Sequence, residues 1–113
     1  MAQLLVVAPN ATFRNSLRFA LEAEGYDVTA MASLATGDSP SSPFDCSIID
    51  HHALDRGGLE GPRILKAFAP VVLLANSPAH PLAALSFRTL TKPTLGASLS
   101  EAVRAAIAAR RAT

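Results

Sequence analysis

Residues 44–50, with the sequence FDCSIID, decide the fold. This segment predicts a buried strand that ends in an acid. Two other segments, LLVV at 4–7 and VVLL at 71–74, are apolar at every position. Alternating polarity would leave one face of a sheet in water, whereas continuous apolar runs indicate strands covered on both faces, as in a parallel sheet flanked by helices.

Helical and strand patterns alternate outward from these segments. After Asn10, a predicted N-cap, the apolar side chains of Phe13, Leu17 and Leu21 share one helical face, and Arg14 falls on the other. Further strands are expected at 26–30 and 87–91, and a last helix carries an inward stripe formed by Leu99, Ala102, Val103, Ala106 and Ile107. The prolines and serines of 33–43, together with Pro78 and Pro81, oppose regular helices. The second and fourth helices are therefore expected to be short or missing.

Composition and charge narrow the class of protein. The chain has 113 residues, of which 50% are hydrophobic, and this predicts one globular domain over 1–113. A net charge of +1 without a basic run gives no sign of nucleic-acid binding. The apolar runs are too short to span a membrane and no signal peptide is recognised, so a cytoplasmic location is expected. The Ala- and Arg-rich end, 108–113, is compatible with continuation into a linker and an output domain.

A reactive site in such a sheet is expected where the strands end. In open parallel α/β sheets, ligands bind beyond the carboxyl ends of the strands. In this chain those positions are 8–10, 50–52, 75–77 and 91–93.

Four short segments resemble a known family when taken in order. They are IID at 48–50, GLE at 58–60, PVVLL at 70–74 and LTKP at 90–93. Their order and spacing resemble the response-regulator receiver domain of bacterial two-component signalling, over almost the whole chain. The resemblance implies a flavodoxin-like, three-layer α/β fold with strand order 2-1-3-4-5, and a signalling domain rather than an enzyme.

The resemblance also assigns two site residues. In the family, the acid that ends the third strand accepts a phosphoryl group from a histidine kinase, and a lysine after the fifth strand contacts that group. These positions correspond to Asp50 and Lys92. Both lie at the carboxyl edge of the predicted sheet, so we expect their charged groups to approach each other.

Other positions depart from the family pattern. The two acids that hold Mg²⁺ in the family are replaced by Ala8 and Pro9. The hydroxyl that follows the phosphoryl group is replaced by Ala75, and the aromatic switch residue is replaced by Thr89. These replacements indicate a degenerate form, a pseudo-receiver.

The charges of the remaining pair argue against Mg²⁺. Asp50 and Lys92 together carry no net charge, so bound Mg²⁺ would leave about two uncompensated positive charges in a partly desolvated pocket. Magnesium binding is therefore expected to be weak or absent, and no cofactor is expected.

The leading interpretation is a pseudo-receiver that acts through protein contacts without Mg²⁺-assisted phosphorylation. Its expected partner is a signalling protein, a histidine kinase or a regulator, and homodimerisation is open as well. Trimming of the fourth helix predicts an apolar contact face that includes Leu85, Phe87, Leu95 and Leu99.

Two alternatives remain. One is an atypical receiver that is phosphorylated on Asp50. The other is a small-ligand-binding flavodoxin-like domain, which has the least support because no glycine-rich loop follows the first strand.

Histidines and the single cysteine could suggest other chemistry. His51, His52 and His80 could be combined with Asp50 into a zinc cluster, but the adjacent side chains of His51 and His52 are expected to point in different directions, so no metal site is predicted. Cys46 is expected to be a small core residue, because nothing places a base beside it.

Overall fold

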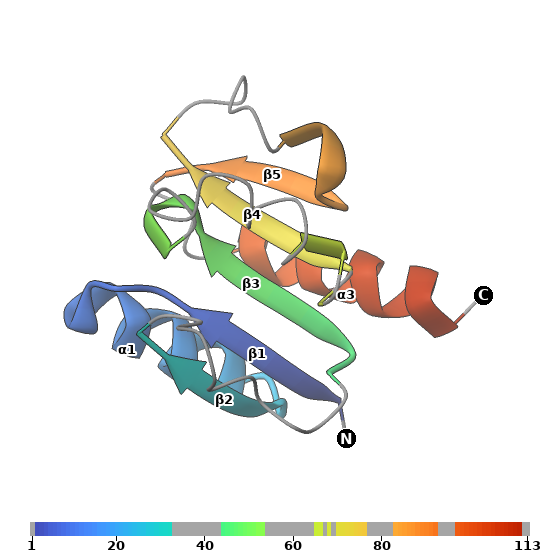
Figure 1. Cartoon of the computed structure of the whole chain (residues 1–113). Helices are drawn as coiled ribbons and strands as arrows, with labels where there is room; N and C mark the ends of the chain where they lie inside the picture. The colour runs from blue at the N-terminus through green and yellow to red at the C-terminus, as the bar shows by residue number, and fades with distance from the viewer. Residues whose placement is uncertain are drawn as a thin grey trace.

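The computed structural model describes residues 2–32, 44–53, 65–66, 68, 70–76, 83–92 and 97–111. These residues contain a five-stranded parallel sheet with the order β2-β1-β3-β4-β5, which confirms the predicted order (Figure 1). The strands are β1 (Gln3–Val7), β2 (Asp27–Met31), β3 (Cys46–Asp50), β4 (Val71–Ala75) and β5 (Arg88–Thr91).

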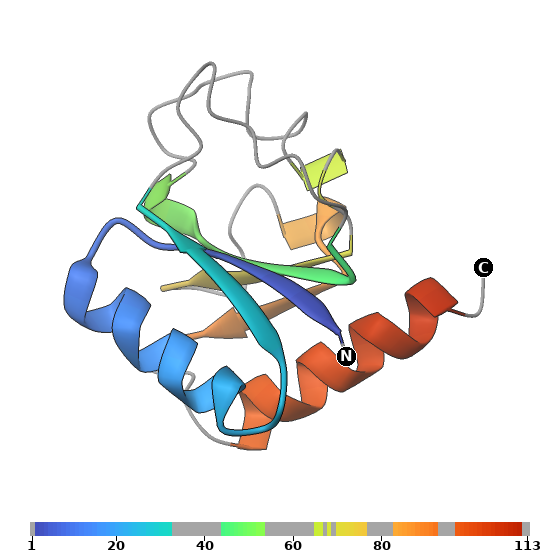
Figure 2. The same cartoon turned by 90° about the horizontal axis from the view of Figure 1, so that it is seen from below.

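Two α-helices have described bounds, α1 (Ala11–Glu22) and α3 (Ala97–Arg111), and both pack on the same face of the sheet (Figure 2). Leu65 and Lys66 are also helical, and Leu65 packs on the opposite face. The described residues also contain two 3-10 turns. The turn η1 (His51–Ala53) follows β3, and the turn η2 (Ala83–Leu85) precedes β5. The turn η2 is what the structure describes of the expected fourth helix. The segment at 33–43, where the second helix was expected to be degraded, lies outside the described residues. Among the described residues, no helix combines the length and apolarity needed to cross a bilayer.

The start and end of α1 follow from its sequence. The side-chain oxygen of Asn10 accepts a hydrogen bond from the Phe13 N–H at 2.9 Å, which confirms the predicted N-cap. Beyond the helix, Gly25 adopts a φ of +93°, a left-handed conformation that favours glycine and turns the chain toward β2. Leu17 and Leu21 of α1 are fully buried against the sheet.

The three central strands are buried on both faces. Leu4 and Val6 of β1 join a core cluster with α1 and α3, whereas Leu5 and Val7 join a second cluster on the opposite face with Leu65. Every described residue of β3 and β4 is buried as well. The strands are apolar at every position because both faces of the parallel sheet are covered, as the sequence indicates.

The predicted contact face is corrected at one position. Leu99 is 1% exposed and belongs to the core, because it forms part of the inward stripe of α3. Leu85 and Phe87 are exposed, at 57% and 40%. Leu95 lies outside the described residues.

Candidate functional site

Strand register brings the predicted site residues to one edge of the sheet. Ile49 pairs with Val7, and Asp50 pairs with Leu74. On the next strand, Ala75 pairs with Thr91, so Lys92 leaves the sheet at the same edge. The carboxyl ends of four strands thus place Ala8, Asp50, Ala75 and Lys92 around one site.

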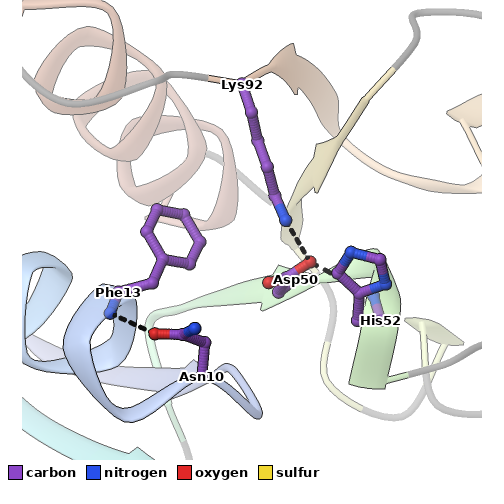
Figure 3. A network of polar contacts seen from close by, with 5 residues as sticks. All are labelled: Asn10, Phe13, Asp50, His52 and Lys92. Atoms are coloured by element: carbon purple, nitrogen blue, oxygen red, sulfur yellow. Dashed lines mark hydrogen bonds and ion pairs between the residues drawn. The ribbon is translucent and has the colours of Figure 1, made fainter.

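Asp50 and Lys92 form the central contact of this site (Figure 3). The Lys92 ammonium lies 2.8 Å from Asp50 Oδ1. The Lys92 side chain is 21% exposed, and the Asp50 side chain is 2% exposed. The same oxygen accepts a hydrogen bond from the His52 backbone N–H at 3.1 Å. The predicted approach of the two charged groups is confirmed, and the buried carboxylate has a cation and an N–H donor as partners.

Phe13 lies beside the lysine and was not predicted as a site residue. Its ring centroid is 5.1 Å from Lys92 Nζ, within the range of a cation–π interaction. Figure 3 shows the Phe13 ring to the left of the ammonium and Asp50 below it. The sequence signal for Phe13 was only its place on the inward face of the helix.

The positions of the family's two acids have a different chemistry here. Ala8 is completely buried in the core, and Pro9 is exposed. The guanidinium of Arg14 donates to the carbonyl oxygens of Ala8 at 2.8 Å and Pro9 at 3.4 Å. Arg14, expected on the water-facing side of the helix, instead bends back and supplies a donor to backbone carbonyls at the end of β1. A guanidinium, rather than two carboxylates, therefore lies on this side of the site.

The residues at the two switch positions, Ala75 and Thr89, both take part in hydrogen bonds. Ala75 is buried, and its carbonyl accepts the Lys92 N–H at 2.9 Å. The Thr89 hydroxyl lies 2.9 Å from the hydroxyl of Ser86, which is also 2.8 Å from the Ala83 carbonyl and donates to it. Thr89 is thereby linked to the turn η2.

The histidines after β3 differ from the prediction. The rings of His51 and His52 do not point apart but lie 4.0 Å apart between centroids, tilted by 36°. One ligand atom each from Asp50, His51 and His52 fall within 4.8 Å of one another. The tight 3-10 turn η1 accounts for this, because it curls the chain directly after the strand. His80 lies outside the described residues.

Cys46 is confirmed as a core residue. It is completely buried, and burial raises the pKa of its thiol to about 12. The group is therefore a neutral thiol near pH 7 and offers no thiolate for nucleophilic chemistry.

Two surface hollows in the described part of the chain lie away from the site. One, of about 470 Å³, is lined by Ala2, Tyr26 and Arg104, among others. Another, of about 420 Å³, is lined by Pro70, Phe87 and others. Ala2 precedes β1 and Pro70 precedes β4, so both hollows lie at the amino-terminal edge of the sheet, opposite Asp50.

The fold and the strand-end site define the class as a flavodoxin-like fold of the response-regulator receiver type. No family model matches the sequence, and no curated protein matches it either. Solved structures do: a response regulator receiver domain from Clostridium thermocellum is 26% identical with a TM-score of 0.75, and the match covers 99% of this chain and 98% of that one. Full-length FixJ from B. japonicum is 26% identical with a TM-score of 0.79, over 96% of this chain and 59% of FixJ.

A CheY-like receiver domain from Methanospirillum hungatei shows the same fold at 16% identity. Its TM-score is 0.81, with 99% of this chain and 98% of that chain covered. The chain spans well under two thirds of the length of FixJ. Together these neighbours support a receiver-type role in signal transduction.

Proposed function

We propose that the chain is a pseudo-receiver that signals through protein contacts and does not depend on Mg²⁺-assisted phosphorylation. The observation that carries the proposal is the Asp50–Lys92 pair. The carboxylate has its charge matched by an ammonium 2.8 Å away, while Ala8 and Pro9 have no side-chain oxygen to offer a metal. The Asp50–Lys92 pair is therefore balanced in charge without an ion.

The ligands available at the strand ends fit Mg²⁺ poorly. Mg²⁺ requires a near-octahedral set of oxygen atoms and is usually held by one or two carboxylates together with substrate phosphate. Asp50 offers one carboxylate, shared with Lys92. The nearby amide oxygen of Asn10 caps α1 by accepting the Phe13 N–H. The guanidinium of Arg14 donates to the Ala8 carbonyl and so adds positive charge at the end of β1, where the family has its two acids.

This chain also lacks the two residues through which receivers of the family switch. Conversion of a local charge into a surface change needs an element with two alternative states. Ala75 has no hydroxyl to attract, and Thr89 has no ring to reorient and is hydrogen-bonded to Ser86. A constitutive contact surface follows more naturally from this site than a phosphorylation-controlled one.

Phosphorylation gives the direct test of this proposal. Incubation of the chain with acetyl phosphate and millimolar Mg²⁺ is expected to leave the intact mass unchanged, because no metal is held to neutralise the transferred phosphoryl oxygens. Calorimetry is expected to show weak Mg²⁺ binding or none. The Asp50→Asn variant is the control. A mass increase that needs Mg²⁺ and disappears in Asp50→Asn would support the atypical phospho-acceptor instead.

That alternative has an observation in its favour, since Asp50 and Lys92 are both present and in contact at the family's positions. Among the described residues, the small-ligand alternative gains no such support. The two described hollows lie at the opposite edge of the sheet, away from the strand ends where such folds bind ligands.

The contact surface that we propose is the exposed pair Leu85 and Phe87, which line one hollow together with Pro70 and Arg110. Its partner is a signalling protein, a histidine kinase or a regulator. Arg88 lies over the Phe87 ring at 5.7 Å, so the patch joins an apolar surface to a positive charge. Aromatic and arginine side chains are typical anchors of protein interfaces.

Association is expected to depend on this patch and not on the acid. Phe87→Asp should weaken partner binding at least about tenfold by placing a charge in the apolar contact, while Asp50→Ala should leave it intact. Phe19→Asp is a matched control, because Phe19 is exposed on α1, away from the patch. Affinity capture with identification of the bound protein, and sedimentation for self-association, measure the effect. Loss in Asp50→Ala with binding retained in Phe87→Asp would contradict the proposal.

A further inference from the structure

We propose that Asp50, His51 and His52 bind a divalent transition-metal ion of the type that prefers imidazole, with Zn²⁺ as the representative ion. The three residues are consecutive, and the turn η1 brings one ligand atom from each to within 4.8 Å of the others. This goes beyond the proposed function, which assigns no ligand to the histidines. It also differs from the sequence prediction, whose premise that the two imidazoles point apart is wrong.

The donor set suits such an ion. Zinc takes histidine nitrogen and carboxylate oxygen, and sites with three protein ligands leave a fourth position for water. Bonds of about 2.1 Å in a tetrahedral arrangement place neighbouring ligand atoms about 3.4 Å apart. Ligand atoms up to 4.8 Å apart must therefore move closer together when an ion binds, by rotation about side-chain bonds.

The environment allows both access and retention. Asp50 and His51 are 1% and 8% exposed, whereas His52 is exposed and opens the site to solvent. Both histidines make a further non-covalent contact in the structure, which an incoming ion must accommodate or replace. Asp50 and His51 are thus buried in the fold, and His52 lies at the surface, where an ion reaches it from solvent.

The Asp50–Lys92 pair makes the proposal sharper. The Lys92 ammonium, 2.8 Å from Asp50 Oδ1, repels a metal ion that binds the same carboxylate. Lys92 therefore opposes metal binding at Asp50. The charge of the pair opposes Zn²⁺ as much as Mg²⁺, and the two ions are separated by their ligands, since imidazole nitrogens favour zinc, copper and nickel over magnesium.

Zinc titration of the full chain without a polyhistidine tag tests the site. Calorimetry with Zn²⁺ is expected to show one site per chain, and His52→Gln and His51→Gln are each expected to weaken it at least about tenfold. His52 is exposed, so its replacement is compatible with folding, which circular dichroism verifies. His80→Gln removes the remaining histidine of the chain and is expected to leave the affinity unchanged.

The Lys92→Gln variant is expected to have the opposite effect on Zn²⁺ affinity. Removal of the competing ammonium is expected to tighten Zn²⁺ binding by about tenfold, an outcome that general damage to the fold does not produce. The proposal is overturned if no Zn²⁺ binding is seen below about 1 mM. It is also overturned if His80→Gln weakens binding as much as His52→Gln does, or if Lys92→Gln weakens it.

Discussion

Leu74→Ala is expected to lower the free energy of unfolding by about 3 kcal/mol. Leu74 is completely buried in β4, where it pairs with Asp50 on one side and Leu90 on the other. Truncation of a buried leucine removes apolar burial and leaves a cavity that the neighbouring strands cannot fill, because both are held by the sheet. Urea unfolding followed by circular dichroism measures the change.

Leu85→Ala makes the same chemical change on the surface. Leu85 is 57% exposed in the turn η2, so the loss is expected to stay within about 0.5 kcal/mol. Equal losses in the two variants would mean that the strand ends are not the packed core described here. If Leu85→Ala loses little free energy of unfolding, the variant can also be used in binding experiments, because an effect on association would then not come from unfolding.

The fold could be predicted because its signals are local and redundant. Continuous apolar runs at 4–7 and 71–74 identify strands buried on both faces, and such strands belong to parallel sheets. The N-cap at Asn10 and the stripe of α3 are equally local, and both are found in the structure. Leu99 was assigned both to that stripe and to a contact face, and its burial shows that the periodicity of the helix was the stronger signal.

The Asp50–Lys92 contact was predictable for a related reason. Parallel strands end at one edge, so residues that follow different strands meet there whatever the loops between them do. The strand register and the length of a lysine side chain were enough to join residues 42 positions apart.

Other features of the site depend on side-chain directions that no pattern encodes. Arg14 lies on the polar face of α1 by periodicity, yet its long side chain reaches the Ala8 carbonyl. The close approach of the His51 and His52 rings depends on a single 3-10 turn, which the sequence does not mark. The Phe13–Lys92 contact joins a helix to the end of a distant strand and follows only from the tertiary packing.

Lys92→Met is expected to lower the free energy of unfolding by about 1–3 kcal/mol. Methionine keeps an unbranched apolar chain and removes the charge, so the loss reports on the ammonium. Asp50, with its side chain 2% exposed, keeps the His52 N–H but loses its only described cation. The lower part of the range applies because the lysine is itself 21% exposed and partly hydrated.

The double variant Asp50→Asn with Lys92→Met isolates the pair. Asparagine is close in shape to aspartate and needs no counter-charge, so the double variant is expected to recover most of the stability lost in Lys92→Met. The difference between the summed single changes and the double change is the coupling between the two groups. A Lys92→Met variant as stable as the parent chain would contradict a balanced pair, because it would show that the carboxylate is stable without its cation. In that case the site would have room for a different cation, and the reasoning that favours a receiver without bound Mg²⁺ would lose its main support.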